Sequence, residues 1–202
     1  MAKGRQNEIN RKLTVPGLAP AQGPAEANVA LLHAFEIGQS GIEETRRVWD
    51  VMESGGNSAD KTRVMNYSFV CFNGLRPKSY DQTVVLIERR DLALPHFLLT
   101  KKQVFHWFEK VLKVPTLISF DRATLNKMYQ LKGEDEVAIR ALFNPQVCIA
   151  LEQHPGLTIE GRGPQLLIFR ESVVLNPLEC PRFLGESRKL AELLSSSAPK
   201  VA

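Results

Sequence analysis

The segment Thr83-Val84-Val85-Leu86-Ile87 decides the fold of this 202-residue chain. Five consecutive β-branched or aliphatic side chains predict a central strand covered on both faces. Before it, Asp60–Asn73 alternates in polarity, so one face of that strand must be buried. Ile42–Glu53 is also extended, and the paired glycines in 54–58 supply the positive φ that a reversing loop needs. We therefore expect a hairpin beside the 83–87 strand.

Further strands are expected downstream of this centre. Leu94–Leu99 is placed at an edge of the sheet, because Pro95 has no N–H to donate to a neighbouring strand. Met128–Leu131 is a short strand. Leu157–Glu160 and Gln165–Phe169 flank a Gly-Arg-Gly-Pro turn and predict a second hairpin. The predicted fold is α+β, with a mainly antiparallel sheet of about five to seven strands and helices packed on one face.

The helices are expected between these strands, where apolar residues recur at helical spacing. They are Ala27–Gln39, Lys101–Lys113, a turn after Asp121, Glu134–Phe143, Asn144–His154 and a last helix that begins between Pro177 and Pro181. Asn144 and Pro145 have the residue types of an N-cap and a first helical position. Acidic residues in Gly133-Glu134-Asp135-Glu136 suit a helix start, since they interact favourably with its dipole.

Composition and charge divide the chain into three parts. Residues 1–27 are expected to be a flexible basic tail and linker, 28–195 a single α+β domain, and 196–202 a disordered C-terminus. The formal net charge is +4, but four cations and one acid within residues 1–12 supply three of those charges. A nearly neutral domain argues against a dedicated nucleic-acid function. The tail could still contact phosphates nonspecifically, and such binding would show a steep salt dependence that vanishes when residues 1–12 are deleted.

Targeting signals and cysteine usage both point to the cytoplasm. The polar start lacks an apolar core of signal-peptide length, and no apolar run approaches the ~18 residues of a spanning helix. Three cysteines form an odd set without metal-like spacing, which argues against a disulfide framework. We expect a cytoplasmic protein, with association at a membrane surface left open.

Several phrases of the chain together resemble a family of uncharacterised bacterial proteins. They include Asn66-Tyr67-Ser68-Phe69, Gln82-Thr83-Val84-Val85, Leu94-Pro95-His96-Phe97, Tyr129–Glu136, Arg140-Ala141-Leu142-Phe143 and Ile159-Glu160-Gly161. The resemblance covers about residues 42–194 and implies a soluble α+β domain, in members that often carry a membrane anchor. It implies no established activity and no catalytic residues. The chain departs from the family in having no membrane span and in having Asn66 where an acid is expected.

No pattern of residues identifies a catalytic, cofactor or metal site. The four histidines fall in different expected elements, without an i, i+4 pair or a Cys-x-x-Cys partner, so no metal or cofactor is assigned. Asp81, His96 and His106 are the candidates for a spatially assembled pocket, which would be an enzyme site built from scattered loops. Cys180, close to a helix start, is a candidate for a lowered thiol pKa.

The Lys101–Lys113 segment supplies the candidate contact surface, because lysines oppose an aromatic face there. Its candidate contact residues are Lys102, His106, Trp107, Lys110 and Lys113. A helix that simply packs on the core shows the same pattern. The first hypothesis is a non-enzymatic binding or scaffolding domain at a protein or membrane surface. The alternatives are an enzyme with a dispersed site and weak nucleic-acid binding through the tail.

Overall fold

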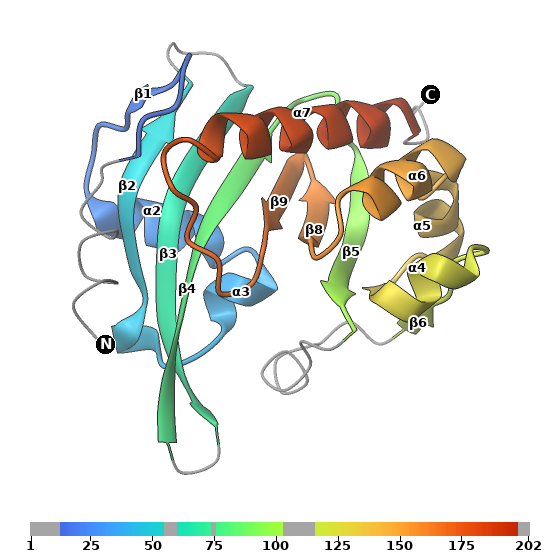
Figure 1. Ribbon diagram of the computed structural model, residues 1–202, viewed down its shortest axis with the longest axis horizontal. Coiled ribbons are helices and arrows are strands. Elements are labelled where there is room, and N and C mark those ends of the chain that lie inside the picture. The colour runs from blue at the N-terminus through green and yellow to red at the C-terminus, as the bar shows by residue number, and fades with distance from the viewer. Residues whose placement is uncertain (1–12, 55–59, 74–75, 103–115, 198–202) are drawn as a thin grey trace.

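The computed structural model describes residues 13–54, 60–73, 76–102 and 116–197, and nine strands in these residues form one antiparallel sheet (Figure 1). The strands are β1 (Ala19–Pro20), β2 (Arg47–Glu53), β3 (Lys61–Asn73), β4 (Arg76–Glu88), β5 (Leu94–Lys101), β6 (Thr116–Ile118), β7 (Tyr129–Gly133), β8 (Thr158–Gly163) and β9 (Gln165–Phe169). Their order in the sheet is β1-β2-β3-β4-β9-β8-β5-β7-β6. The expected antiparallel sheet is present, but the expected count of five to seven strands is wrong. The two additional strands, β1 and β6, are too short to show an alternating pattern.

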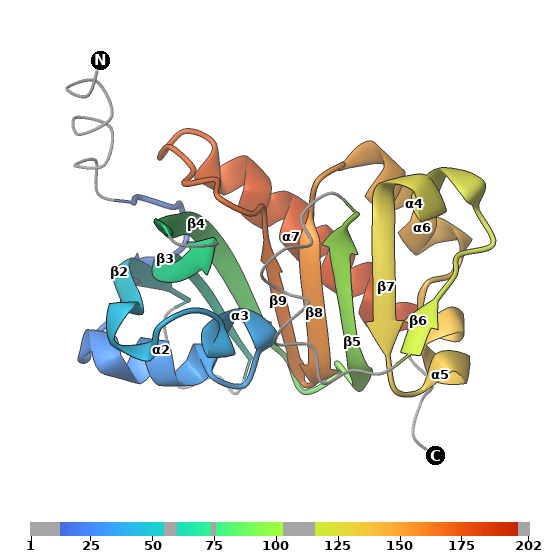
Figure 2. The same ribbon diagram turned by 90° about the horizontal axis from the view of Figure 1, so that it is seen from below.

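Helices cover both faces of this sheet, so the prediction of helices on one face is also wrong. One face carries α2 (Ala25–Leu32) and α3 (Glu36–Gln39), which together we call the α2–α3 segment. The 3-10 helix η1 (Glu43–Thr45) follows this segment in the chain. The opposite face carries α4 (Ala123–Met128), α5 (Glu136–Leu142), α6 (Pro145–Gln153) and α7 (Cys180–Ser197). Figure 2 shows α3 and α7 on opposite sides of the central strands.

Two hydrophobic cores therefore lie on either side of the sheet. Val85 and Ile87 point into the larger core beneath α4–α7, whereas Val84 and Leu86 point into the smaller core beneath α2 and α3. All four side chains are at most 1% exposed. The prediction of a central strand covered on both faces is confirmed, and its continuous apolar run follows from burial on both sides.

The hairpin of β3 and β4 extends well beyond the body of the sheet (Figure 1). Its register runs from Lys61 opposite Glu88 to Asn73 opposite Arg76, but β9 pairs with β4 only over Val84–Glu88. We call the outer part, 69–73 of β3 and 76–81 of β4, the hairpin arm. Residues 76–81 of the arm are the first half of the long strand β4.

The strand β5 lies inside the sheet, between β8 and β7, so its predicted edge position is wrong. Pro95 is tolerated because the pairing with β8 shifts register between Leu94 and Phe97, so its missing N–H falls at an irregularity in the ladder.

The helix expected over Ala27–Gln39 is broken into α2 and α3, and Pro24 takes the N-cap position of α2. The chain turns so tightly there that a Cβ on Gly38 would lie 1.8 Å from the carbonyl oxygen of Leu32. Only glycine permits this approach. The turn carries Leu32, Phe35 and Ile37 into the smaller core, each 0% exposed.

The core also includes residues that precede position 28. Leu13 and Val15 are 5% and 2% exposed and belong to the larger core, and β1 pairs with β2. At the other end, α7 begins at Cys180, within the expected range. Among the described helices, none combines the length and apolar character needed to cross a lipid bilayer.

Candidate functional site

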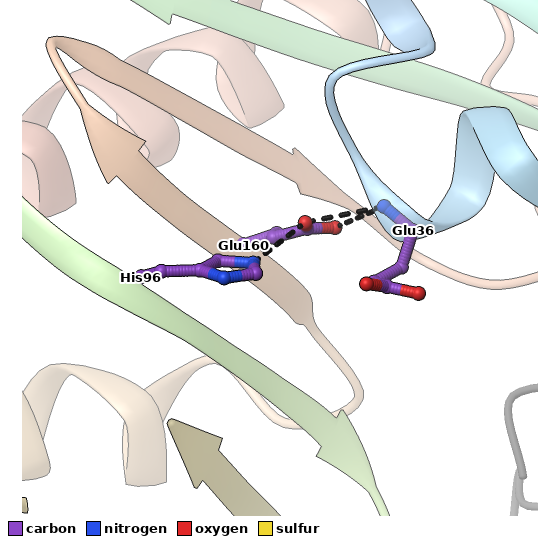
Figure 3. A group of neighbouring side chains, drawn as sticks. All are labelled: Glu36, His96 and Glu160. Atoms are coloured by element: carbon purple, nitrogen blue, oxygen red, sulfur yellow. Dashed lines mark hydrogen bonds and ion pairs between the residues drawn. The ribbon is translucent and has the colours of Figure 1, made fainter. Parts of the chain in front are cut away.

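Glu36, His96 and Glu160 form a cluster where the α2–α3 segment meets the sheet (Figure 3). Glu36 is the first residue of α3, His96 lies on β5 and Glu160 lies on the adjacent strand β8. In Figure 3 the His96 ring and the Glu36 side chain lie on either side of the Glu160 carboxylate. One ligand-type atom from each residue lies within 4.8 Å of those of the other two. We call these three residues the buried triad.

Glu160 is the central member of the buried triad. Its side chain is 1% exposed, and the strand alternation that sends Ile159 into the larger core sends Glu160 to the α2–α3 side. Its two carboxylate oxygens accept from the backbone N–H of Glu36 at 3.1 and 2.9 Å. Burial raises the pKa of this carboxyl group, although its contacts with His96 and the Glu36 N–H oppose the shift.

His96 links the buried triad to the surface. Its Nε2 lies 3.5 Å from Oε1 of Glu160 and its Nδ1 lies 3.8 Å from Oε1 of Glu134, while its side chain is 17% exposed. The Nε2 atom is buried and makes no hydrogen bond of normal geometry to the described residues. The pKa of His96 is raised, and the largest cause is Glu160, because its carboxylate stabilises the imidazolium.

A second contact fixes the same junction. Arg162, two residues after Glu160 on the same side of β8, donates from Nη1 to the carbonyl oxygen of Ala34 at 3.0 Å. Glu160 and Arg162 therefore hold the α2–α3 segment through its backbone on both sides of Phe35. Chemically, the buried triad offers an imidazole nitrogen and two carboxylates in a desolvated place, a donor set suited to protons or to a divalent metal ion.

Of the three pocket candidates, the structure describes Asp81 and His96, and these two lie apart. Asp81 lies in the hairpin arm and accepts from Ser79 Oγ at 3.1 and 3.2 Å. It is on β4, which β9 and β8 separate from the β5 strand of His96. His106, the third pocket candidate, lies outside the described residues. The candidate contact residues Trp107, Lys110 and Lys113 also lie outside them, whereas Lys102 is exposed and its Nζ donates to the Asn126 carbonyl at 3.0 Å.

Two other sequence expectations have clear outcomes. The suggestion that Cys180 has a lowered pKa is wrong: burial, with a smaller effect from Glu179, raises the pKa of its thiol to about 11. The acidic group before α5 includes a helix cap, since Asp135 accepts from the Ala138 N–H at 2.9 Å. Its neighbour Glu134 is the acid that approaches His96.

The α6–α7 side of the sheet carries a surface hollow of about 320 Å³ around Glu186. Arg182 donates to this carboxylate at 2.9 Å, and Arg170 and His154 lie 3.4 and 3.5 Å from it. Its charged groups are thus engaged with one another. Neither Asp81 nor His96 lines this hollow or any of three smaller hollows elsewhere on the described residues.

Sequence reasoning missed Glu36 and Glu160 as partners of His96. The residues are far apart in the chain, 124 positions in the case of Glu36 and Glu160, and their meeting depends on the order of strands in the sheet. A signal was nevertheless present, because Glu160 follows Thr158 and Ile159 in the first part of β8, whose four residues 158–161 are all buried. A carboxylate in such a strand needs a partner.

Comparisons with known proteins establish a likeness of fold. No family model matches the chain, and no curated protein matches it. The crystal structure of the mycobacterial trehalose monomycolate transport factor A is similar, with a TM-score of 0.59 and 12% sequence identity, over 92% of this chain and 91% of that one. The two chains therefore share a fold over nearly their whole lengths.

Proposed function

We propose that this chain is a non-enzymatic binding domain that acts at an anionic membrane surface, as an accessory to transport. The fold likeness supports the general class, because the similar structure belongs to a transport factor. The observation that carries the proposal is the hairpin arm, which projects from the sheet and combines an exposed aromatic side chain with two exposed cations.

Phe72 is the exposed aromatic residue among those of the arm, with 63% of its side chain exposed. Its neighbours across the hairpin are Pro77 directly opposite and the basic residues Arg76 and Lys78 on either side of that proline, all exposed. Alternation along the strands puts the Phe72 ring on one face of the arm and Arg76 and Lys78 on the other. An apolar face opposite a basic face is the combination that enters the boundary between lipid headgroups and acyl chains. Each basic residue near an anionic surface contributes about 1 kcal/mol of attraction.

The base of the arm holds it in position. The rings of Phe69 and Tyr80 stack with centroids 5.3 Å apart, and Lys78 Nζ lies 4.6 Å from the centroid of Tyr80. Phe69 and Tyr80 are also buried in the smaller core. The arm is therefore anchored at its base, and presenting Phe72 to a surface requires no loss of buried contacts.

Co-sedimentation with phosphatidylserine-containing vesicles at low salt tests the proposal. Wild-type protein should bind, Phe72→Ser should weaken binding, and Arg76→Glu/Lys78→Glu should lower the partition coefficient at least about tenfold because two attractions become repulsions. All variants should stay folded with a Tm close to that of wild type, since the altered side chains are exposed and only the contact of Lys78 with Tyr80 is lost.

Two matched controls separate the arm from general effects of charge and hydrophobicity. Arg188→Glu/Lys189→Glu reverses two exposed cations on α7, and Leu178→Ser removes an apolar side chain that is 86% exposed. Both should bind vesicles like wild type. Absence of wild-type binding, or equal losses in the controls and the arm variants, would show that the arm is not a membrane contact.

A further inference from the structure

We infer that the buried triad of Glu36, His96 and Glu160 is a binding site for one divalent transition-metal ion of the Zn²⁺ type. Glu160 and Glu36 are 1% and 5% exposed, and an imidazole nitrogen points to the same place from the neighbouring strand. Mixed nitrogen and oxygen ligands favour Zn²⁺ and its first-row neighbours over Ca²⁺, which takes oxygen ligands in larger number.

The electrostatics of the buried triad support this assignment. Two carboxylates close together in a place of low dielectric repel each other, and such groups need a compensating positive charge. A divalent cation held among the three ligand atoms supplies that charge.

The geometry needs a modest adjustment. Zn²⁺ lies about 2.0–2.2 Å from nitrogen and oxygen ligands, which places the ligands of a tetrahedral ion about 3.4 Å apart. The ligand atoms of the triad lie within 4.8 Å of one another. Rotation of the Glu36 side chain can close this gap, because that residue already meets Glu160 through its backbone N–H, at 2.9 and 3.1 Å.

The surroundings of His96 also fit a metal ligand. Its Nε2 faces Glu160, and its Nδ1 lies 3.8 Å from the more exposed Glu134 carboxylate. A carboxylate behind the second ring nitrogen orients many metal-binding histidines and raises their basicity. Three protein ligands leave a fourth position for water. The ion would join α3, β5 and β8 at one point.

A competition titration with a chromophoric zinc indicator tests the site, using full-length protein first stripped with a chelator. Wild-type protein should bind one Zn²⁺ per chain, and saturating Zn²⁺ should raise its Tm. His96→Gln and Glu36→Gln should each weaken binding at least about tenfold, and Glu134→Gln should weaken it less, because that residue acts through His96. Ca²⁺ in excess should not displace the zinc.

The matched control is His154→Gln, which removes another partly buried histidine paired with a glutamate, here 3.5 Å from Glu186. It should bind Zn²⁺ like wild type. Glu36→Gln keeps the backbone N–H that Glu160 accepts, so it decides the question if His96→Gln fails to fold. Absence of stoichiometric Zn²⁺ binding, or wild-type affinity in Glu36→Gln, would overturn the inference.

Discussion

At the scale of single residues, the three cysteines differ mainly in how deeply their thiols are buried. Cys148 and Cys180 are 5% and 1% exposed, whereas Cys71 in the hairpin arm is partly exposed. Burial raises the pKa of all three thiols, to about 11 for Cys180. Because a thiolate is the reactive form, the position of Cys180 near the start of α7 does not make it a nucleophile.

This difference predicts the order of alkylation. At pH 8 the native protein should react with iodoacetamide first at Cys71, and Cys180 should react at least about a hundredfold more slowly than in the denatured chain, because about a thousandth of it is thiolate. Peptide mass mapping over time measures each site. Labelling of Cys180 at the rate of Cys71 would contradict the assigned environment.

Gly161, next to Glu160, is a second residue whose role follows from its contacts. A Cβ at this position would lie 2.2 Å from Cε1 of Phe97, whose ring is 0% exposed and meets Phe143 edge-on at 5.1 Å. Gly161→Ala should therefore lower the free energy of unfolding by about 1–3 kcal/mol through overpacking. Urea unfolding measures the change.

The control for this substitution is Gly185→Ala in α7, where a Cβ would meet no atom within 4 Å. Because alanine favours the helix interior over glycine, this variant should gain up to about 1 kcal/mol. Equal effects of the two substitutions would mean that the Phe97 ring is free to move away from β8.

At the scale of elements, a buried hydroxyl joins β4 to the connection between β9 and α7. Thr83 is 1% exposed; its Oγ1 donates to Asn66 Oδ1 at 2.7 Å and accepts from the Leu175 N–H at 2.9 Å. Its own N–H donates to the Val173 carbonyl at 2.9 Å. The connection thus continues the sheet beside β4 beyond the end of β9.

Thr83→Val keeps the shape of this side chain and removes its hydroxyl. Leu175 N–H and Asn66 Oδ1 then lose a buried partner, so the free energy of unfolding should fall by about 1–3 kcal/mol. Thr116→Val on the edge strand β6 should change it by less than about 0.5 kcal/mol. Denaturant midpoints for the two variants that agree within error would refute the bridging role of Thr83.

The elements that the sequence predicts correctly are those with local causes. Asn144 caps α6 by accepting from the N–H groups of Gln146 and Val147, as its position before Pro145 indicates. The edge assignment of β5 failed because the rule for Pro95 does not anticipate a register shift. The buried triad could not be predicted, because it depends on the nonlocal neighbourhood of β5, β8 and α3.

For the whole molecule, the question is where the folded domain begins. Sequence composition places a flexible linker up to residue 27, whereas Leu13 and Val15 are buried in the larger core. Between them and α2, the Leu18 N–H donates to the Val15 carbonyl at 3.0 Å and β1 pairs with β2. Proline and glycine in this stretch form turns in a segment that packs against the sheet.

Leu13→Ala tests whether this segment belongs to the cooperative unit. Removing a side chain that is 5% exposed should lower the free energy of unfolding by about 2–5 kcal/mol, with a single transition by both circular dichroism and tryptophan fluorescence. The matched control, Val137→Ala on α5, alters a side chain that is 80% exposed and should change stability by less than about 0.5 kcal/mol. If both substitutions change the free energy of unfolding by the same small amount, residues before 28 do not stabilise the fold and the boundary predicted from composition is correct. If only Leu13→Ala lowers the free energy of unfolding, the domain instead begins at the start of the described chain. Truncating a leucine lowers stability only where its side chain is packed in the native state.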